Sequence, residues 1–140
     1  MNNDIKKVCV FASSSNFLDE VYYEDARLLG NLLGKNGYDV VYGGSNLGLM
    51  WACAGEVKNT GGKLTGIMPE KLHNMGVFTK GCNEFLVTKG MRERKAKLDE
   101  LSDAVIALAG GFGTLEELSE MIVQKQLGYN NKPIVLLNTN

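Results

Sequence analysis

The chain has 140 residues, of which 44% are hydrophobic and 22% charged, and its formal net charge is −1. This length and apolar content are enough for a sizeable core, so we expect a single domain over residues 1–140. No basic excess points to nucleic acid, and no apolar run reaches the ~18 residues of a membrane-spanning helix. The first residues lack the apolar segment of a signal peptide, so we expect a cytoplasmic protein.

The cysteines and the histidine argue against a metal site. Cys9, Cys53 and Cys82 are far apart in the sequence and form no Cys-x-x-Cys pair, so we expect buried free thiols. His73 is the only histidine, which argues against histidine ligation of a metal. We therefore expect neither a metal nor a cofactor.

Apolar runs alternate with amphipathic segments along the chain. The apolar runs predict six strands, at residues 7–12, 38–42, 63–68, 82–87, 103–109 and 134–137. Helical periodicity predicts four helices. One spans residues 19–35, one follows the turn at 43–50 and ends near residue 59, one runs from 91 to about 101, and one follows the last glycine turn and ends near residue 128. The segment 69–81 should be a loop that has room for a helical turn. This alternation is typical of an α/β protein with a Rossmann-like, doubly wound parallel sheet, and we expect the strand order 3-2-1-4-5-6.

Polar or glycine-rich turns follow the first, second and fifth of these strands, so they would share one edge of the sheet. The Ser13 hydroxyl in the first turn is able to bond a ribose, a base or a phosphate, although turn propensity explains the serines equally well. The second turn, around Gly44, is neither a Walker loop nor a G-x-G-x-x-G fingerprint. It serves either a ligand or only the close packing of a strand on a helix.

The densest glycine turn lies in residues 109–117, Ala-Gly-Gly-Phe-Gly-Thr-Leu-Glu-Glu. Three glycines in four positions let the backbone approach a ligand closely, and Thr114 with the free N–H groups of a helix start would favour an anion. The alternative is a tight turn with a threonine cap. Glu117 would lie one helical turn from a bound phosphate, which suggests chemistry there. Alternatively, Glu116 and Glu117 are ordinary acidic residues of a first helical turn.

Cationic side chains interrupt the apolar face of the helix that is predicted to begin at residue 91. Its inward stripe should contain Met91, Arg94 or Lys95, Leu98 and Leu101. A charge that faces a core needs a partner. Arg94 therefore either meets such a partner or extends its guanidinium past the apolar face to water.

These motifs together resemble the LOG ("Lonely Guy") family, whose members are often labelled possible lysine decarboxylases. The family signature Pro-Gly-Gly-x-Gly-Thr-x-x-Glu stands at residues 109–117 with Ala109 in place of proline. The arginine–lysine signature stands at residues 91–96 with Arg92 in place of the usual histidine. The Tyr-Gly-Gly turn with Gly-Leu-Met and the Lys-Pro-Ile…Leu-Asn ending match as well. The resemblance covers essentially the whole chain, although family members continue beyond the point where this sequence stops.

The resemblance implies a hydrolase that cleaves the N-glycosidic bond of purine nucleoside 5′-monophosphates, of the cytokinin type or AMP, into free base and ribose 5-phosphate. It also implies a homodimer. Arg94 and Glu117 would be the catalytic residues, with Arg94 paired to Glu117 and keeping it ionised. The implied substrate-binding positions are Ser13, Gly44, Met91, Lys95, Gly110, Gly111, Gly113, Thr114 and Glu116.

One rival class stays open at this point. Molybdenum-cofactor carrier proteins are similar in fold and glycine turns, and they hold a phosphate-bearing ligand without turning it over. The combination of Arg94 with Glu117 favours the enzyme. The decarboxylase label finds no support, because no lysine stands in a recognisable pyridoxal-binding context.

Overall fold

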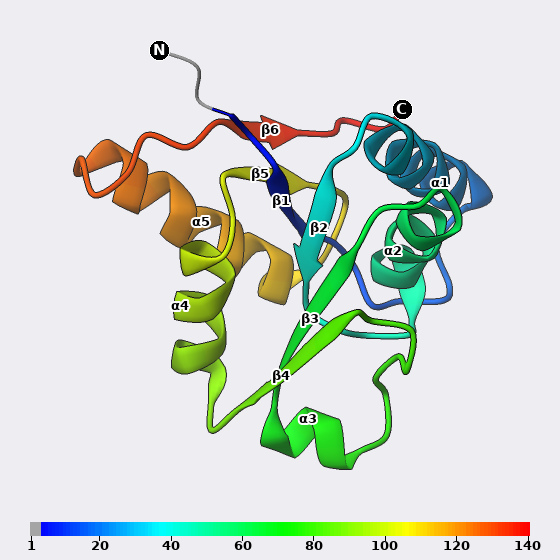
Figure 1. Ribbon diagram of the computed structural model, residues 1–140, viewed down its shortest axis with the longest axis horizontal. Coiled ribbons are helices and arrows are strands. Elements are labelled where there is room, and N and C mark those ends of the chain that lie inside the picture. The colour runs from blue at the N-terminus through cyan, green and yellow to red at the C-terminus, as the bar shows by residue number, and fades with distance from the viewer. Residues whose placement is uncertain (1–3) are drawn as a thin grey trace.

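The computed structural model describes residues 4–140 and is organised around one six-stranded sheet in which every pair of neighbours is parallel (Figure 1). The strands are β1 (Lys7–Phe11), β2 (Asp39–Tyr42), β3 (Leu64–Pro69), β4 (Glu84–Thr88), β5 (Ala104–Ala107) and β6 (Ile134–Leu136). The helices are α1 (Glu20–Lys35), α2 (Gly48–Asn59), α3 (Glu70–Asn74), α4 (Met91–Glu100) and α5 (Phe112–Gln126). The predicted α/β class, the parallel sheet and the approximate bounds of its elements are confirmed.

The strand order is β4-β3-β2-β1-β5-β6, so the predicted position of the fourth strand is wrong. We expected this strand between the first and the fifth, but β4 lies at the outer edge beside β3. Burial explains the difference. Leu86 and Val87 of β4 are 37% and 49% exposed, as suits an edge strand, whereas Val105 of β5 is fully buried beside β1.

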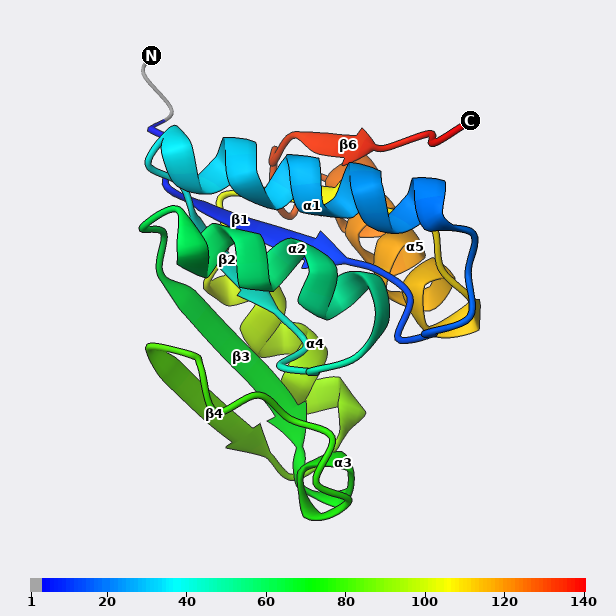
Figure 2. The ribbon, with the colours of Figure 1, turned by 90° about the vertical axis from the view of Figure 1, so that its right-hand side faces the viewer.

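Helices cover both faces of the sheet, as Figures 1 and 2 show from two directions. α1 and α2 pack on one face and against each other, and α4 and α5 lie on the other face. Small residues allow the close contact of α1 with α2, since a Cβ on Gly30 would stand 2.1 Å from the carbonyl oxygen of Cys53. The two faces therefore have separate apolar clusters, with β1 contributing Val8 and Val10 to one and Cys9 and Phe11 to the other.

The cysteines agree only in part with their predicted burial. All three are free thiols, and Cys9 and Cys53 are buried, but Cys82 is only partly buried. Within residues 4–140, no three histidine, cysteine or acidic side chains are grouped so that they could hold a metal ion. None of the helices in this part of the chain is long and apolar enough to cross a membrane.

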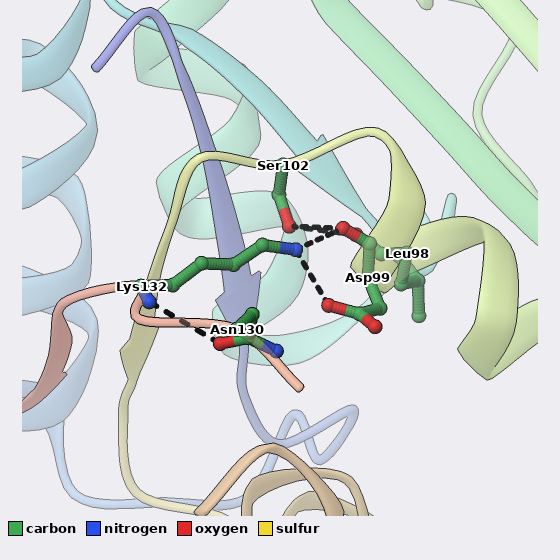
Figure 3. Close-up of polar contacts among 5 residues, drawn as sticks. All are labelled: Leu98, Asp99, Ser102, Asn130 and Lys132. Atoms are coloured by element: carbon green, nitrogen blue, oxygen red, sulfur yellow. Dashed lines mark hydrogen bonds and ion pairs between the residues drawn. The ribbon is translucent and has the colours of Figure 1, made fainter. Parts of the chain in front are cut away.

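A polar cluster anchors the segment before β6 to the end of α4 (Figure 3). The Lys132 ammonium donates to the Asp99 carboxylate at 2.5 Å and also to the backbone carbonyl of Asp99. The Ser102 hydroxyl donates to the carbonyl of Leu98 at 2.7 Å, and the Asn130 side-chain oxygen accepts from the N–H of Lys132. This cluster lies at the edge of the sheet where the strands begin, opposite the edge that carries the glycine turns.

Candidate functional site

The carboxyl ends of β1 and β5 mark the point where the connections of the sheet change direction. Strands β2 to β4 lie on one side of β1, and β5 and β6 lie on the other. In open α/β sheets such a switch point leaves a crevice between the loops that leave the strands. Here the Ser13 N–H donates to the Ala109 carbonyl at 3.0 Å, and the Met50 N–H donates to the Ser13 carbonyl at 3.3 Å. The prediction that three turns share one edge is thus confirmed.

A cavity of about 410 Å³ lies at this edge. It brings together residues from all three turns and from α4. Of the predicted site residues, the following line it: Ser13, Met91, Arg94, Gly111, Gly113, Thr114 and Glu117. Four others do not line it, namely Gly44, Lys95, Gly110 and Glu116.

Gly110 supports Thr114 from behind. A Cβ at residue 110 would stand 2.1 Å from the Thr114 hydroxyl oxygen, so any other side chain would displace Thr114. α5 begins at Phe112, its N-cap is Gly111, and no side chain caps its first N–H groups. The threonine-cap alternative is therefore wrong. The uncapped N–H groups and the helix dipole give the start of α5 a partial positive charge, and Gly111, Gly113 and Thr114 place this helix end at the cavity.

Arg94 is buried, at 6% exposure, and backbone carbonyls hold its guanidinium. Its Nε donates to the carbonyl of Ile67 at 2.9 Å, and its Nη2 donates to the carbonyl of Gly43 at 3.0 Å. A Cβ on Gly43 would stand 2.2 Å from Nη2, so this glycine makes room for the arginine. The second glycine turn thus fixes Arg94, while Gly44 lies against the ring of Phe85.

Glu117 lines the same cavity from α5 but makes no ion pair with Arg94. Within the described residues no carboxylate oxygen lies within 4.0 Å of the Arg94 nitrogens, so the expected direct pair is not formed. Burial raises the pKa of Glu117 to about 7, although the Arg94 charge opposes this rise. Burial therefore favours the protonated form of Glu117, whereas the sequence predicts that Arg94 keeps this side chain ionised.

This pKa predicts a pH dependence of stability. A carboxyl whose pKa is raised from 4.5 to about 7 binds its proton more tightly in the folded state. The free energy of unfolding should therefore fall as the pH rises through this interval, and it stays lower above it. Glu117→Gln removes this dependence and should be more stable than wild type by about 2 kcal/mol at pH 8. Chemical denaturation of both proteins between pH 5 and 8 measures the difference. If the difference in unfolding free energy between the two proteins stayed the same from pH 5 to 8, the raised pKa of Glu117 would be contradicted.

Lys95 and Glu116 contact each other outside the cavity. The Lys95 ammonium donates to the Glu116 carboxylate at 2.5 Å and lies 3.3 Å from the carboxylate of Glu120. The hydrogen bond to Glu116 raises the pKa of Lys95. These contacts link α4, which carries Arg94, to α5, which carries Glu117.

Sequence analysis missed the apolar side of the cavity. These apolar lining residues are Leu47, Met50, Met68, Leu72 and Val77, together with the predicted Met91. Leu72 and Val77 lie in the segment predicted to be a loop, where no periodicity marked them. Ser14 and Ser45 also line the cavity. Only the run of serines after the first strand pointed to Ser14, and the turn after the second strand pointed to Ser45.

Comparison with known proteins gives consistent matches. The family described as "Possible lysine decarboxylase" matches residues 50–140. A cytokinin riboside 5′-monophosphate phosphoribohydrolase, LOG5 of Arabidopsis thaliana, is 41% identical over 135 residues, which cover 96% of this chain and 59% of the relative. The enzyme LOG of Oryza sativa subsp. japonica, with the same description, is 39% identical over 96% of this chain and 56% of the relative. The chain therefore spans a little under three fifths of the length of these relatives.

Solved structures of similar fold include molybdenum-cofactor proteins. The molybdenum cofactor binding protein of Rippkaea orientalis is 28% identical with a TM-score of 0.78, over 97% of this chain and 78% of that one. The Moco carrier protein of Chlamydomonas reinhardtii is 24% identical with the same TM-score and coverage, which shows the shared fold alone.

Proposed function

Because the chain belongs to the LOG family, described as possible lysine decarboxylases, we propose that it is a hydrolase. The proposed reaction cleaves the N-glycosidic bond of purine nucleoside 5′-monophosphates and gives free base and ribose 5-phosphate. One observation carries the proposal. Thr114, at the anion-binding end of α5, and Glu117, one turn further along, line the same cavity. A bound 5′-phosphate would thus place its ribose beside a carboxyl group.

The two sides of the cavity suit the two ends of such a substrate. The 5′-phosphate would bind the N–H groups at the start of α5, near Gly111, Gly113 and Thr114. The base would lie against the apolar wall that includes Met50 and Leu72, which suits an unsubstituted purine or one with an apolar N6 group of the cytokinin type. Ser13, Ser14, Ser15 and Ser45 also line the cavity, and their hydroxyls are able to bond the ribose.

The chemistry follows from the charge that develops on the sugar. Breaking the N-glycosidic bond gives an oxocarbenium-like ribose, and a nearby carboxylate stabilises that cation or activates the water that attacks it. A carboxyl with a pKa of about 7 is well matched to accept a proton at neutral pH. The Arg94 guanidinium favours the ionised form of Glu117 through its charge. The phosphate contacts supply binding energy away from the reacting carbon, which orients the substrate.

The phosphate site predicts a preference for monophosphates. The turn at residues 110–114 offers one anion-binding helix end and no Walker lysine for further phosphates. AMP should therefore be hydrolysed at least tenfold faster than adenosine or ATP, as kcat/KM, if losing or misplacing this anchor costs about 1.4 kcal/mol or more. Chromatography of free adenine with the full chain measures all three rates. Equal rates on AMP and adenosine would contradict the phosphate anchor.

A second candidate function is the non-catalytic carrier of a nucleotide or molybdenum cofactor. The similarity to the Rippkaea orientalis protein, at 28% identity and a TM-score of 0.78, favours it. The two functions differ in outcome, because a carrier returns its ligand intact. The position of Glu117 favours the enzyme. A half-buried carboxylate beside the anion site would repel a phosphate-bearing ligand, and a protein that only carries this ligand would gain nothing from it.

We also propose a homodimer. α5 leaves an exposed apolar stripe on its outer side, formed by Phe112, Leu115, Ile122, Val123 and Leu127. Exposed apolar side chains at this density along one helix are typical of a protein–protein contact. The stripe begins beside the glycine turn, so a second copy bound there would border the cavity.

A further inference from the structure

A second cavity, of about 700 Å³, lies behind the wall of the first. The loops after β1 and β2 form that wall and expose different residues to its two sides. Ser15, Ser45 and Leu47 line the first cavity, whereas Asn16, Asn46 and Gly48 line the second. The Asn16 side-chain oxygen accepts a hydrogen bond from the N–H of Gly48 at 2.8 Å and ties the loops together. The two cavities share no lining residue, so the second one is a separate space.

One side of α2 forms the floor of the second cavity. Trp51, Gly55 and Lys58 lie at i, i+4 and i+7, which places them on one face of the helix. The indole of Trp51 lies beside Gly55, where a Cβ would stand 3.4 Å from the ring. Trp51 is only partly buried and lines the cavity. The floor therefore offers an aromatic ring with no side chain at Gly55 to block it.

The charged side chains that line this cavity are predominantly cationic. Arg27, Lys58 and Lys80 line it, against the single carboxylate of Glu56. Arg27 already pairs with Glu20, but no carboxylate lies within 4.0 Å of the Lys58 or Lys80 ammonium in residues 4–140. Two ammonium groups thus have charge available for an anion.

Local packing brings Lys58 to the loop that carries Lys80. Lys80 lies in the loop before β4, and the Thr79 hydroxyl holds that loop by accepting from the Gly81 N–H at 3.1 Å. A Cβ on Gly81 would stand 2.9 Å from the Lys58 ammonium nitrogen, so Lys58 extends from α2 to this loop. Lys58 therefore reaches the loop that carries Lys80, and both side chains line the same cavity.

We propose that the second cavity binds a small polyanion that carries a planar ring, the chemical class of the nucleoside di- and triphosphates. The ring would stack on Trp51, and the phosphates would bind Lys58 and Lys80. Aromatic side chains stack on any nucleobase face, and lysine is a common phosphate ligand. The volume lies in the range of known small-molecule sites. The proposal uses no residue of the proposed hydrolytic site, so either one stands or fails alone.

The fluorescence of Trp51 tests this proposal directly, because it is the only tryptophan of the chain. Titration of the full chain with ADP or ATP should give a saturable change. Lys58→Gln with Lys80→Gln should raise the dissociation constant roughly tenfold or more, since two charge-assisted contacts are lost. The matched control is Lys35→Gln with Lys71→Gln, which removes the same charge from exposed positions outside the cavity and should leave the titration unchanged.

Three further titrations separate the parts of the proposal. Adenosine and inorganic triphosphate should each bind at least tenfold more weakly than ATP, because each lacks one of the two contacts. Thr114→Val, which alters only the first cavity, should leave the Trp51 signal intact. The proposal is overturned if ATP gives no saturable change, if the double lysine variant binds as wild type does, if adenosine or triphosphate alone matches ATP, or if Thr114→Val abolishes the signal.

Discussion

Glu117→Gln is expected to lower the turnover of AMP by a factor of about 100 or more, which is the usual cost of losing one electrostatic or acid–base group. Glutamine keeps the size and hydrogen-bonding capacity of the side chain but cannot stabilise the cationic ribose or accept a proton. AMP should still bind, because the phosphate contacts come from the start of α5 and from Thr114. Steady-state kinetics give the rate, and calorimetry with the inactive variant gives the dissociation constant.

Glu120→Gln is the matched control for this variant. Glu120 lies on the same helix, three residues further along, but it contacts Lys95 and does not line the cavity. Its replacement should change kcat by less than about twofold, the size expected when one exposed ion pair is lost. A Glu117→Gln protein with wild-type turnover, or a Glu120→Gln protein equally impaired, would contradict the catalytic role of Glu117.

Arg94→Met is expected to reduce both stability and turnover. The variant leaves the carbonyls of Ile67 and Gly43 without their donors in a buried place, which should cost about 2–4 kcal/mol of unfolding free energy. Turnover should fall by about tenfold or more where the variant is still folded, because Arg94 also lines the cavity and favours the ionised Glu117. Denaturant unfolding and initial rates measure the two effects.

The pH profile separates the charge of Arg94 from its structural role. Because the Arg94 charge lowers the pKa of Glu117, its removal should raise that pKa above about 7 and shift the ascending limb of the rate profile to higher pH. Arg94→Lys retains the positive charge and should restore the position of that limb. If Arg94 and Glu117 serve the same step, the double variant should be little slower than the slower single variant. If the pH profile of the rate did not shift in a folded Arg94→Met protein, the role of Arg94 would be limited to packing.

The sequence was sufficient for the elements and for part of the site, because local patterns determine both. Apolar runs and helical periodicity located the strands and helices that carry the cavity except α3, which lies in a segment predicted to be a loop, and glycine density located the start of α5. Arg94 was recognisable as a charge on an apolar face. Its actual partners were not, because the carbonyls of Ile67 and Gly43 come from distant parts of the chain and carry no mark in the sequence.

The remaining features depend on tertiary contacts, which local sequence patterns do not show. The place of β4 depends on which strands are buried on both faces, and an apolar run such as Phe85–Val87 does not reveal whether its side chains meet a helix or water. Lys95 and Glu116 stand within the family motifs, yet their contact with each other is visible only once α4 and α5 lie side by side. The raised pKa of Glu117 arises from burial, which spacing along a helix does not show.

The most direct test of the proposed reaction is the chemical identity of the products. The full chain is incubated with AMP and, separately, with N6-prenylated AMP, and the mixture is separated by chromatography. Our account predicts free base and ribose 5-phosphate in equal amounts, with both products lost in Glu117→Gln. Recovery of intact, bound nucleotide would support the carrier, and the appearance of nucleoside with free phosphate would show that a different bond is broken. Either result would contradict N-glycosidic hydrolysis by this cavity.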